Sequence, residues 1–204
     1  YTRIGREDLR TFLQEYDLGE LVSYTGIQQG VENTNYHIET DNNTYILTLF
    51  EARVEPADLP FFFAFTDHLG QYGIDCPHAI SDRQGRRISK LADKPAVLVT
   101  CLRGHDLDPA EITPGHCRRL GQTLAVMHKA GQTFKRERPN AMGIAKWKEL
   151  AAYCLARGDE VEYDLPRFIA EEIAWLERNW FHDLPSGVVH TDLFPDNVFF
   201  DDAG

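Results

Sequence analysis

Alternating apolar and polar residues mark three short segments near the start of the chain, at 22–27, 35–40 and 43–50. They are rich in β-branched and aromatic residues, and the Asp-Asn pair between the last two favours a tight turn, as in an antiparallel meander. Two further strands are predicted, RRISKL around a turn at 82–85 and AVLVTCL at 96–102. The pattern therefore predicts a five-stranded antiparallel sheet.

Helical spacing occurs at two places in the same part of the chain. Apolar residues recur every three to four positions within the first 20 residues, and Gly19 predicts the end of that helix. A second helix is predicted to open at Pro56 and Pro60 and to end at Gly73. Its phenylalanine-rich run, FFFAF, is expected in the core. This second helix lies between the third and fourth strands.

The pattern changes at Arg103, where the polar stretch LRGHDLDPAEITPG is broken by glycine and proline. From there to Gly187 the periodicity is helical, and one helix is predicted to start near Asp164. Two short strands, GVVH and VFFD, are predicted on either side of TDLFPDN. We therefore expect an α+β, protein-kinase-like fold, with an N-terminal lobe at 1–102 and a mostly helical C-terminal lobe at 103–204.

Charge and composition exclude several classes of function. The net charge is −11 and the basic residues are scattered, so nucleic acid is not an expected partner. No apolar run reaches the roughly 18 residues of a membrane span, and the first residues are charged, so a cytoplasmic location is predicted. The four cysteines form no CxxC pair and are expected to be reduced thiols in the core. The sequence predicts no oligomeric state.

The residues that suggest chemistry lie in the loop between the last two predicted strands. His190, Asp192 and Asn197 match H-x-D-x-x-x-x-N, the spacing of a kinase catalytic loop. Asp192 is predicted to accept or orient the proton of an attacking hydroxyl, and Asn197 to bind Mg²⁺. His190 is a further catalytic candidate, although histidine at this position more often braces the loop backbone. Thr191 replaces the arginine that pairs with a phosphorylated activation loop, so no such switch is expected.

The predicted ATP site departs from the protein-kinase pattern. Gly30 lies in a strand-to-strand turn that suits a phosphate, but the turn lacks G-x-G-x-x-G and equally fits a plain hairpin. No lysine occurs before Lys90, and Thr48 stands where kinases carry the phosphate-binding lysine of the third strand. Arg53, just beyond that strand, is a candidate phosphate contact.

Several stretches together resemble one known group: GVENTNYHIET, YILTLFEARV, PAVLVTCLRG, HCRRLGQTLAVMH, RPNAMGIAKW and VVHTDLFPDNVFF. Over nearly all 204 residues the chain resembles the bacterial homoserine kinases of the aminoglycoside-phosphotransferase-like superfamily. The resemblance implies phosphorylation of the side-chain hydroxyl of L-homoserine by ATP, a step of threonine biosynthesis. It also implies adenine contacts from the backbone of Val99, Cys101 and Leu102, and a phosphate-loop role for Asn33. In this group the missing lysine is expected.

Two features of the predicted site stay open. A zwitterionic amino acid needs a cation for its carboxylate, and Arg138 is a candidate, although it equally fits a solvated basic run, KRER. Kinases also carry a second metal-binding Asp beyond the catalytic Asn. The sequence ends seven residues past Asn197, and Asp201 and Asp202 are expected to form a turn instead. The family pattern therefore predicts that the C-terminal lobe is incomplete.

Three alternatives to a homoserine kinase fit the same residues. A kinase for choline, an aminoglycoside or a sugar amine would carry the same catalytic spacing. A nucleotide-binding pseudokinase would explain the absent lysine and the absent second metal ligand. An α+β domain with a purely structural role would not be stabilised by nucleotide at all.

Overall fold

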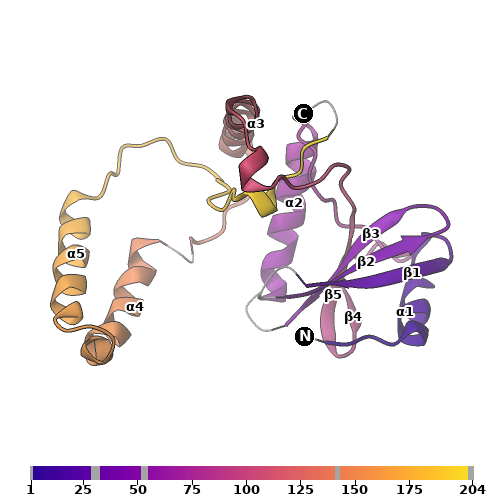
Figure 1. Ribbon diagram of the computed structural model, residues 1–204, viewed down its shortest axis with the longest axis horizontal. Helices are drawn as coiled ribbons and strands as arrows, with labels where there is room; N and C mark the ends of the chain where they lie inside the picture. The colour runs from indigo at the N-terminus through magenta and orange to yellow at the C-terminus, as the bar shows by residue number, and fades with distance from the viewer. Residues whose placement is uncertain (1, 29–32, 52–54, 141–142, 202–204) are drawn as a thin grey trace. The chain divides into compact units, whose positions relative to one another are not determined.

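The computed structural model describes residues 2–28, 33–51, 55–140 and 143–201 (Figure 1). Two compact units are present, Tyr1–Arg136 together with Gly187–Gly204, and Glu137–Ser186. The predicted lobe boundary at residue 102 is a different division of the chain and stays a prediction.

The larger unit is built on the predicted five-stranded sheet. Every neighbouring pair of strands is antiparallel, and the spatial order is β1-β2-β3-β5-β4. The predicted fold class is confirmed, and the strand ends differ from the prediction by only a few residues, except that RRISKL forms a strand over its last three residues alone. The strands are β1 Leu21–Ile27, β2 Asn33–Thr40, β3 Thr44–Phe50, β4 Ser89–Leu91 and β5 Lys94–Thr100.

One face of the sheet packs on helix α1, Arg6–Leu13. Alternate residues of a strand point to opposite faces, and apolar residues at alternate positions of β2, β3 and β5 join this core, including Ile38, Leu47 and Leu98. The helix ends earlier than predicted, and Gly19 is not its C-terminal stop. The amide of Tyr16 bonds the carbonyl of Leu13 in a tight turn, so the predicted apolar position is buried outside the helix.

The opposite face packs on helix α2, Leu59–Gly70, which follows a single 3₁₀ turn at Pro56–Asp58. Val97 and Val99 of β5 meet Leu59 and Phe63 there. The prediction that the phenylalanine run lies in the core is wrong in part, because the side chain of Phe62 is 41% exposed.

An ionic network ties the first residues to the sheet. The Glu51 carboxylate accepts hydrogen bonds from the hydroxyls of Thr2 and Thr34 at 2.7 and 2.6 Å, and pairs with Lys94 Nζ at 2.7 Å. The hydrogen bond from Lys94, and then those from the two hydroxyls, lower the pKa of Glu51 from 4.5 to about 2. The folded state therefore favours the charged carboxylate.

We expect Glu51→Gln to lower the free energy of unfolding by about 2 kcal/mol at neutral pH, allowing for partial solvent screening. A lowered pKa stabilises the fold above the unfolded pKa of 4.5, and that contribution is lost as the pH falls towards 2. Urea unfolding at a series of pH values measures the difference, which should shrink to zero near pH 2. Asp93→Asn, which removes a 97% exposed carboxylate, is the control and should change stability little. A constant Glu51→Gln deficit across this range would contradict the network.

Beyond the sheet, helix α3 spans Pro114–Thr133, within the region where helical periodicity was predicted. Its start is capped by Thr113, whose Oγ1 accepts a hydrogen bond from the His116 amide. Near its end, His68 of α2 donates from Nε2 to the carbonyl of Ala130 at 2.9 Å. This bond joins α2 directly to α3.

The smaller unit contains helices α4, Ile144–Arg157, and α5, Leu165–Asn179. The start of α5 confirms the helix predicted near Asp164. The turn between the helices is tight, since a Cβ on Gly158 would lie 3.0 Å from the Pro166 ring. Among the described residues, no helix is both long enough and apolar enough to cross a membrane.

The four cysteines are free thiols. Their predicted place in the core is wrong for Cys117 and Cys154, which are exposed on α3 and α4. Cys76 is half-buried, and burial, followed by the nearby charge of Asp75, raises the pKa of its thiol to about 11. A thiol with this pKa is a poor nucleophile at neutral pH.

Candidate active site

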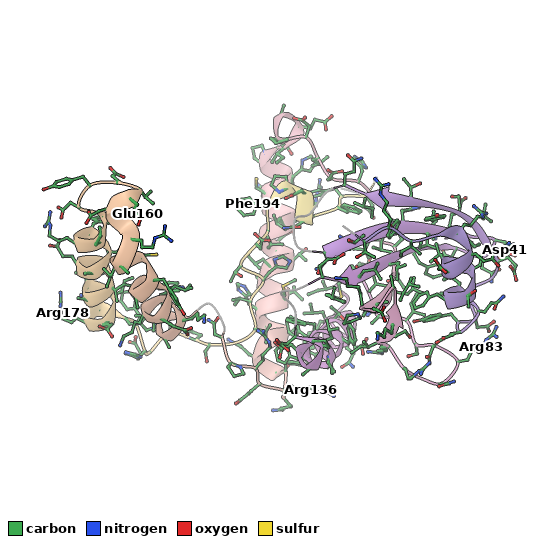
Figure 2. The ribbon with its side chains drawn as sticks, turned by 90° about the horizontal axis from the view of Figure 1, so that it is seen from below. Asp41, Arg83, Arg136, Glu160, Arg178 and Phe194 are labelled. Carbon is green, nitrogen blue, oxygen red and sulfur yellow. The ribbon has the colours of Figure 1, made fainter. Side chains whose placement is uncertain are left out.

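The loop that carries the predicted motif is closed by a hydrogen-bonded pair, Asp192 and Asn197. Asn197 Nδ2 donates to the Asp192 carbonyl oxygen at 2.9 Å and to its carboxylate Oδ2 at 3.0 Å. The loop can return in five residues because Pro195–Asn197 form one 3₁₀ turn, which follows Phe194 (Figure 2). Both the main chain and the side chain of Asp192 are therefore fixed by one amide.

The residues before Asp192 brace its backbone. The Asp192 amide donates to His190 Nδ1 at 3.3 Å, which places the imidazole against the loop. Thr191 between them has φ 62°, a left-handed conformation that costs a β-branched residue energy. The surrounding contacts must offset this strain. A role for His190 in proton transfer stays a prediction.

Two glycines allow the arms of the loop to approach the rest of the larger unit. A Cβ on Gly131 of α3 would lie 2.7 Å from the carbonyl oxygen of Val188. A Cβ on Gly104, which has φ 106°, would lie 2.6 Å from the carbonyl oxygen of Phe200. Only glycine fits such close backbone approaches. The sequence pattern predicted helical periodicity around Gly131, and it placed Gly104 in the polar stretch that links β5 to α3, here called the linker, but it predicted neither contact.

The predicted strands GVVH and VFFD are not formed. Phe200 instead pairs with His105 of the linker, through reciprocal backbone hydrogen bonds of 3.1 and 2.9 Å. Gly187 and Val188 lie against the backbone of Gly131 of α3 instead. The two hydrogen bonds between His105 and Phe200 attach the linker after β5 to the segment that follows Asn197.

Asp192 and Asn197 face a cavity of about 690 Å³. Its lining comes from two segments, 106–109 of the linker and 192–197 of the catalytic loop, and includes the carboxylates of Asp106, Asp108 and Asp196. The lining contains no lysine or arginine among the described residues. The concentration of negative charge favours a cationic ligand or cationic part of a ligand.

The face of the sheet opposite α1 carries polar side chains that suit a nucleotide. Thr48 Oγ1 donates to Asn35 Oδ1 at 2.9 Å. Asn33 Oδ1 is buried and has no hydrogen-bond partner in the described part of the chain, which is a position where a ligand or water often bonds. Asn35 was not predicted from the sequence, although its alternation with buried Thr34 and Tyr36 would place it on this face.

The structure describes some of the remaining predicted residues and not others. Val99 lies within β5, and Cys101 and Leu102 follow the last strand pair, Tyr45 with Thr100. Arg138 belongs to the smaller unit. Two predictions, Gly30 and Arg53, lie outside the described residues. The roles predicted for these residues stay predictions.

Comparison with known proteins identifies the class of this site. A family model described as the phosphotransferase enzyme family, APH, matches residues 23–204. The chain belongs to this family. The fold is that of solved family structures, among them spectinomycin phosphotransferase in complex with ADP and spectinomycin, at a TM-score of 0.64, 14% identity, and coverage of 98% of this chain and 67% of that one. A second is a thermostable mutant of an aminoglycoside phosphotransferase in ternary complex with AMP-PNP and hygromycin B, with a TM-score of 0.60, 15% identity and coverage of 96% and 68%.

Within this family the sequence is similar to homoserine kinases. It is 46% identical to the homoserine kinase of Rhodopseudomonas palustris (strain TIE-1) over 98% of the chain, and 47% identical to that of Rhizobium rhizogenes (strain K84 / ATCC BAA-868) over the same share. The chain spans 61% and 62% of the length of these two relatives. The resemblance predicted from the sequence is confirmed.

Proposed function

We propose that the protein carrying this chain transfers the γ-phosphate of ATP to the side-chain hydroxyl of L-homoserine, giving ADP and O-phospho-L-homoserine. The observation that carries the proposal is the Asp192–Asn197 pair, closed across the loop at 2.9 and 3.0 Å at the edge of a cavity. The similarity to homoserine kinases, at 44–47% identity, supports this choice among small-molecule kinases.

Asp192 holds the attacking hydroxyl. Its Oδ2 is engaged by Asn197, which leaves Oδ1 to accept a hydrogen bond from the substrate hydroxyl. The hydroxyl oxygen then attacks the γ-phosphorus, and the bond between that phosphorus and the oxygen bridging to the β-phosphate breaks as ADP leaves. The hydroxyl proton passes to Asp192 Oδ1. Fixing the carboxylate in advance lowers the entropic cost of this alignment.

The residues present fit Mg²⁺ as the partner of ATP. With Nδ2 of Asn197 engaged by Asp192, the side-chain Oδ1 remains as a hard oxygen donor of the type Mg²⁺ prefers. Asn197 would share the ion with nucleotide phosphates and water. Among the described residues, no group of three His, Cys, Asp or Glu could hold a metal by itself. When bound, Mg²⁺ neutralises the negative charge of the phosphates.

We assign the nucleotide to the polar face of β2 and β3. Asn33, Asn35 and Thr48 would offer neutral hydrogen bonds there in place of the usual lysine. Backbone groups at Val99, Cys101 and Leu102 would receive adenine, and Gly30 and Arg53 the phosphates.

Thr48→Val tests this assignment. The variant keeps the shape of the side chain but loses the donor to Asn35, so we expect the KM for ATP to rise about fivefold, the scale of one neutral hydrogen bond. The KM for homoserine should be unchanged. Thr44→Val, on the same strand and face, is the matched control and should leave both constants near wild type. If the two substitutions changed the KM for ATP equally, the assignment of Thr48 to the nucleotide site would be wrong.

The proposed activity is tested by ADP release with a panel of acceptors, on protein from the complete open reading frame that carries this sequence. We expect release with Mg-ATP and L-homoserine, and little with choline, an aminoglycoside or a sugar amine. Stabilisation by Mg-ATP without turnover of any acceptor would favour a pseudokinase, and a ligand at a hundred times its Kd should raise the stability by about 2.7 kcal/mol.

A further inference from the structure

One side of helix α2 packs against the C-terminal end of α3. Phe61, Phe65 and His68 lie at intervals of four and three residues, so they share this side of the helix. The ring of each lies against Phe134, the residue that directly follows α3, with ring centroids 5.5, 5.1 and 5.3 Å apart. Other side chains of α2 pack on β5. Helix α2 therefore connects the sheet to the end of α3.

His68 is the polar member of this packing, and it contacts the last turn of α3. Its Nε2 lies 2.9 Å from the carbonyl oxygen of Ala130, a fully buried residue, and 3.1 Å from Thr133 Oγ1. Because a carbonyl oxygen can only accept, the Nε2 that faces it carries the proton. Carbonyl groups in the last turn carry the negative end of the helix dipole, so a donor directed at one of them stabilises this end of α3.

The carbonyl of Ala130 directly precedes the residue that contacts the segment leading into the catalytic loop. A Cβ built on the next residue, Gly131, would lie 2.7 Å from the carbonyl oxygen of Val188. Val188 lies two residues before His190, whose Nδ1 accepts the hydrogen bond from the Asp192 amide. Closely packed backbones transmit a displacement from one to the other. A shift of the end of α3 would therefore reach the catalytic carboxylate.

The two ends of the catalytic loop are held by different contacts. Downstream of the loop, Phe200 forms the backbone bridge to His105 of the linker. Upstream, the contact is with the α3 backbone at Gly131. Removing the donor of His68 frees only the upstream contact. The alignment of Asp192 should then change while the bridge and the nucleotide face of the sheet stay in place.

We propose that His68 is a positioning residue for Asp192: its hydrogen bond to the Ala130 carbonyl fixes the end of α3 and, through Val188, the direction of the catalytic carboxylate. This inference rests on the proposed function for its kinetic test and goes beyond it, because His68 contacts neither substrate nor metal in this account. A displacement of about 1 Å at a reacting group can lower a rate on the order of a hundredfold. A small shift of α3 is therefore enough to matter.

His68→Phe tests the hydrogen bond, because phenylalanine keeps the ring packing on Phe134 and has no donor for the carbonyl. We expect kcat with L-homoserine to fall about tenfold, while the KM values for ATP and for L-homoserine stay within about twofold of wild type. A merely structural role would lower stability and leave the kcat of the folded protein unchanged. In His68→Gln the side-chain amide can supply the missing donor, so this variant should keep at least about half of the wild-type kcat.

Tyr72→Phe is the matched control. It removes a hydroxyl that lies 2.6 Å from Thr133 Oγ1 at the same junction, and it leaves the bond from His68 to Ala130 in place. Its kcat should match wild type. If His68→Phe does not fold, His68→Asn replaces it, because the shorter side chain cannot place a donor at the position of Nε2.

The NMR resonance of the Asp192 amide supplies a measurement that needs no activity, since this amide is bonded to His190. On protein from the complete open reading frame, the resonance should shift in His68→Phe and stay near its wild-type position in His68→Gln and Tyr72→Phe. Each shift is read below the unfolding temperature of the variant.

Three results would overturn the proposal: a wild-type kcat in folded His68→Phe, an equal loss in His68→Gln, or an equal loss in Tyr72→Phe. Absence of homoserine phosphorylation by the wild-type protein would refute the proposed function instead. The Asp192 amide then decides the positioning role by itself, and an unmoved resonance in His68→Phe would refute that role.

Discussion

Asp192→Asn is expected to lower kcat about a thousandfold, within the range that a positioned acid–base group contributes. The amide keeps the size of the carboxylate and can still meet Asn197, but it can neither take the hydroxyl proton nor orient the hydroxyl as strongly. Substrate binding should therefore change little. Steady-state ADP release measures kcat, and thermal stabilisation by Mg-ATP measures binding in the same preparation.

Asp183→Asn serves as the control for Asp192, because it replaces an exposed carboxylate of the smaller unit. Its activity should match wild type. If Asp192→Asn retained more than about a tenth of wild-type kcat while folded, another group would have to align the hydroxyl. His190 would then be the first candidate, since its ring already contacts the Asp192 amide.

Gly131→Ala is expected to destabilise the fold by about 2 to 4 kcal/mol and to lower kcat as well. The added Cβ would lie 2.7 Å from the Val188 carbonyl oxygen, a backbone atom that cannot move without shifting the arm that leads to Asp192. In most helix positions the same substitution stabilises, by up to about 1 kcal/mol. Here the close backbone approach reverses the sign. Urea unfolding and kcat are the two measurements.

The chain offers a control for this change within the same helix. A Cβ added to Gly121 of α3 would have nothing within 4 Å among the described residues, so Gly121→Ala should raise stability slightly and leave kcat unchanged. Opposite effects on stability at the two glycines would establish the packing of Val188 on α3. A stabilising effect at Gly131 as well would mean that the arm does not pack there.

The sequence predicted those features that depend on local pattern. Segments rich in β-branched and aromatic residues located the strands. The spacing of His190, Asp192 and Asn197 predicted a loop that the Asn197 amide closes, because the returning amide needs a fixed number of residues. The end of α1 was missed, since Tyr16 is buried at helical spacing even though its backbone has already left the helix. Side-chain periodicity does not report where the hydrogen-bond pattern changes.

The contacts that assemble the site could not be predicted in this way. The bridge between His105 and Phe200 joins residues far apart in the sequence, and neither carries a pattern that selects the other. The same holds for Gly131 with Val188. The sequence places Asp106 in a polar linker, and only the bridge brings it to the cavity of Asp192. Such pairings depend on how the elements pack in three dimensions.

The absent lysine shows how sequence and structure combine. Thr48 was predicted from its place in the third strand, and the structure adds its hydrogen bond to Asn35 on the face to which we assign the nucleotide. A threonine and an asparagine that satisfy each other can remain on this face at little cost in the free protein, whereas an isolated lysine there would need a counter-charge.

The identity of the phosphorylated product tests the central claim most directly. Protein from the complete open reading frame would be incubated with Mg²⁺, L-homoserine and ATP labelled at the γ-phosphate, and the label followed by chromatography against authentic O-phospho-L-homoserine. We predict labelled O-phospho-L-homoserine from the wild type, and about a thousandfold less from Asp192→Asn at equal protein. Label in no product, or only in the phosphate ester of a different hydroxyl compound, would contradict the account.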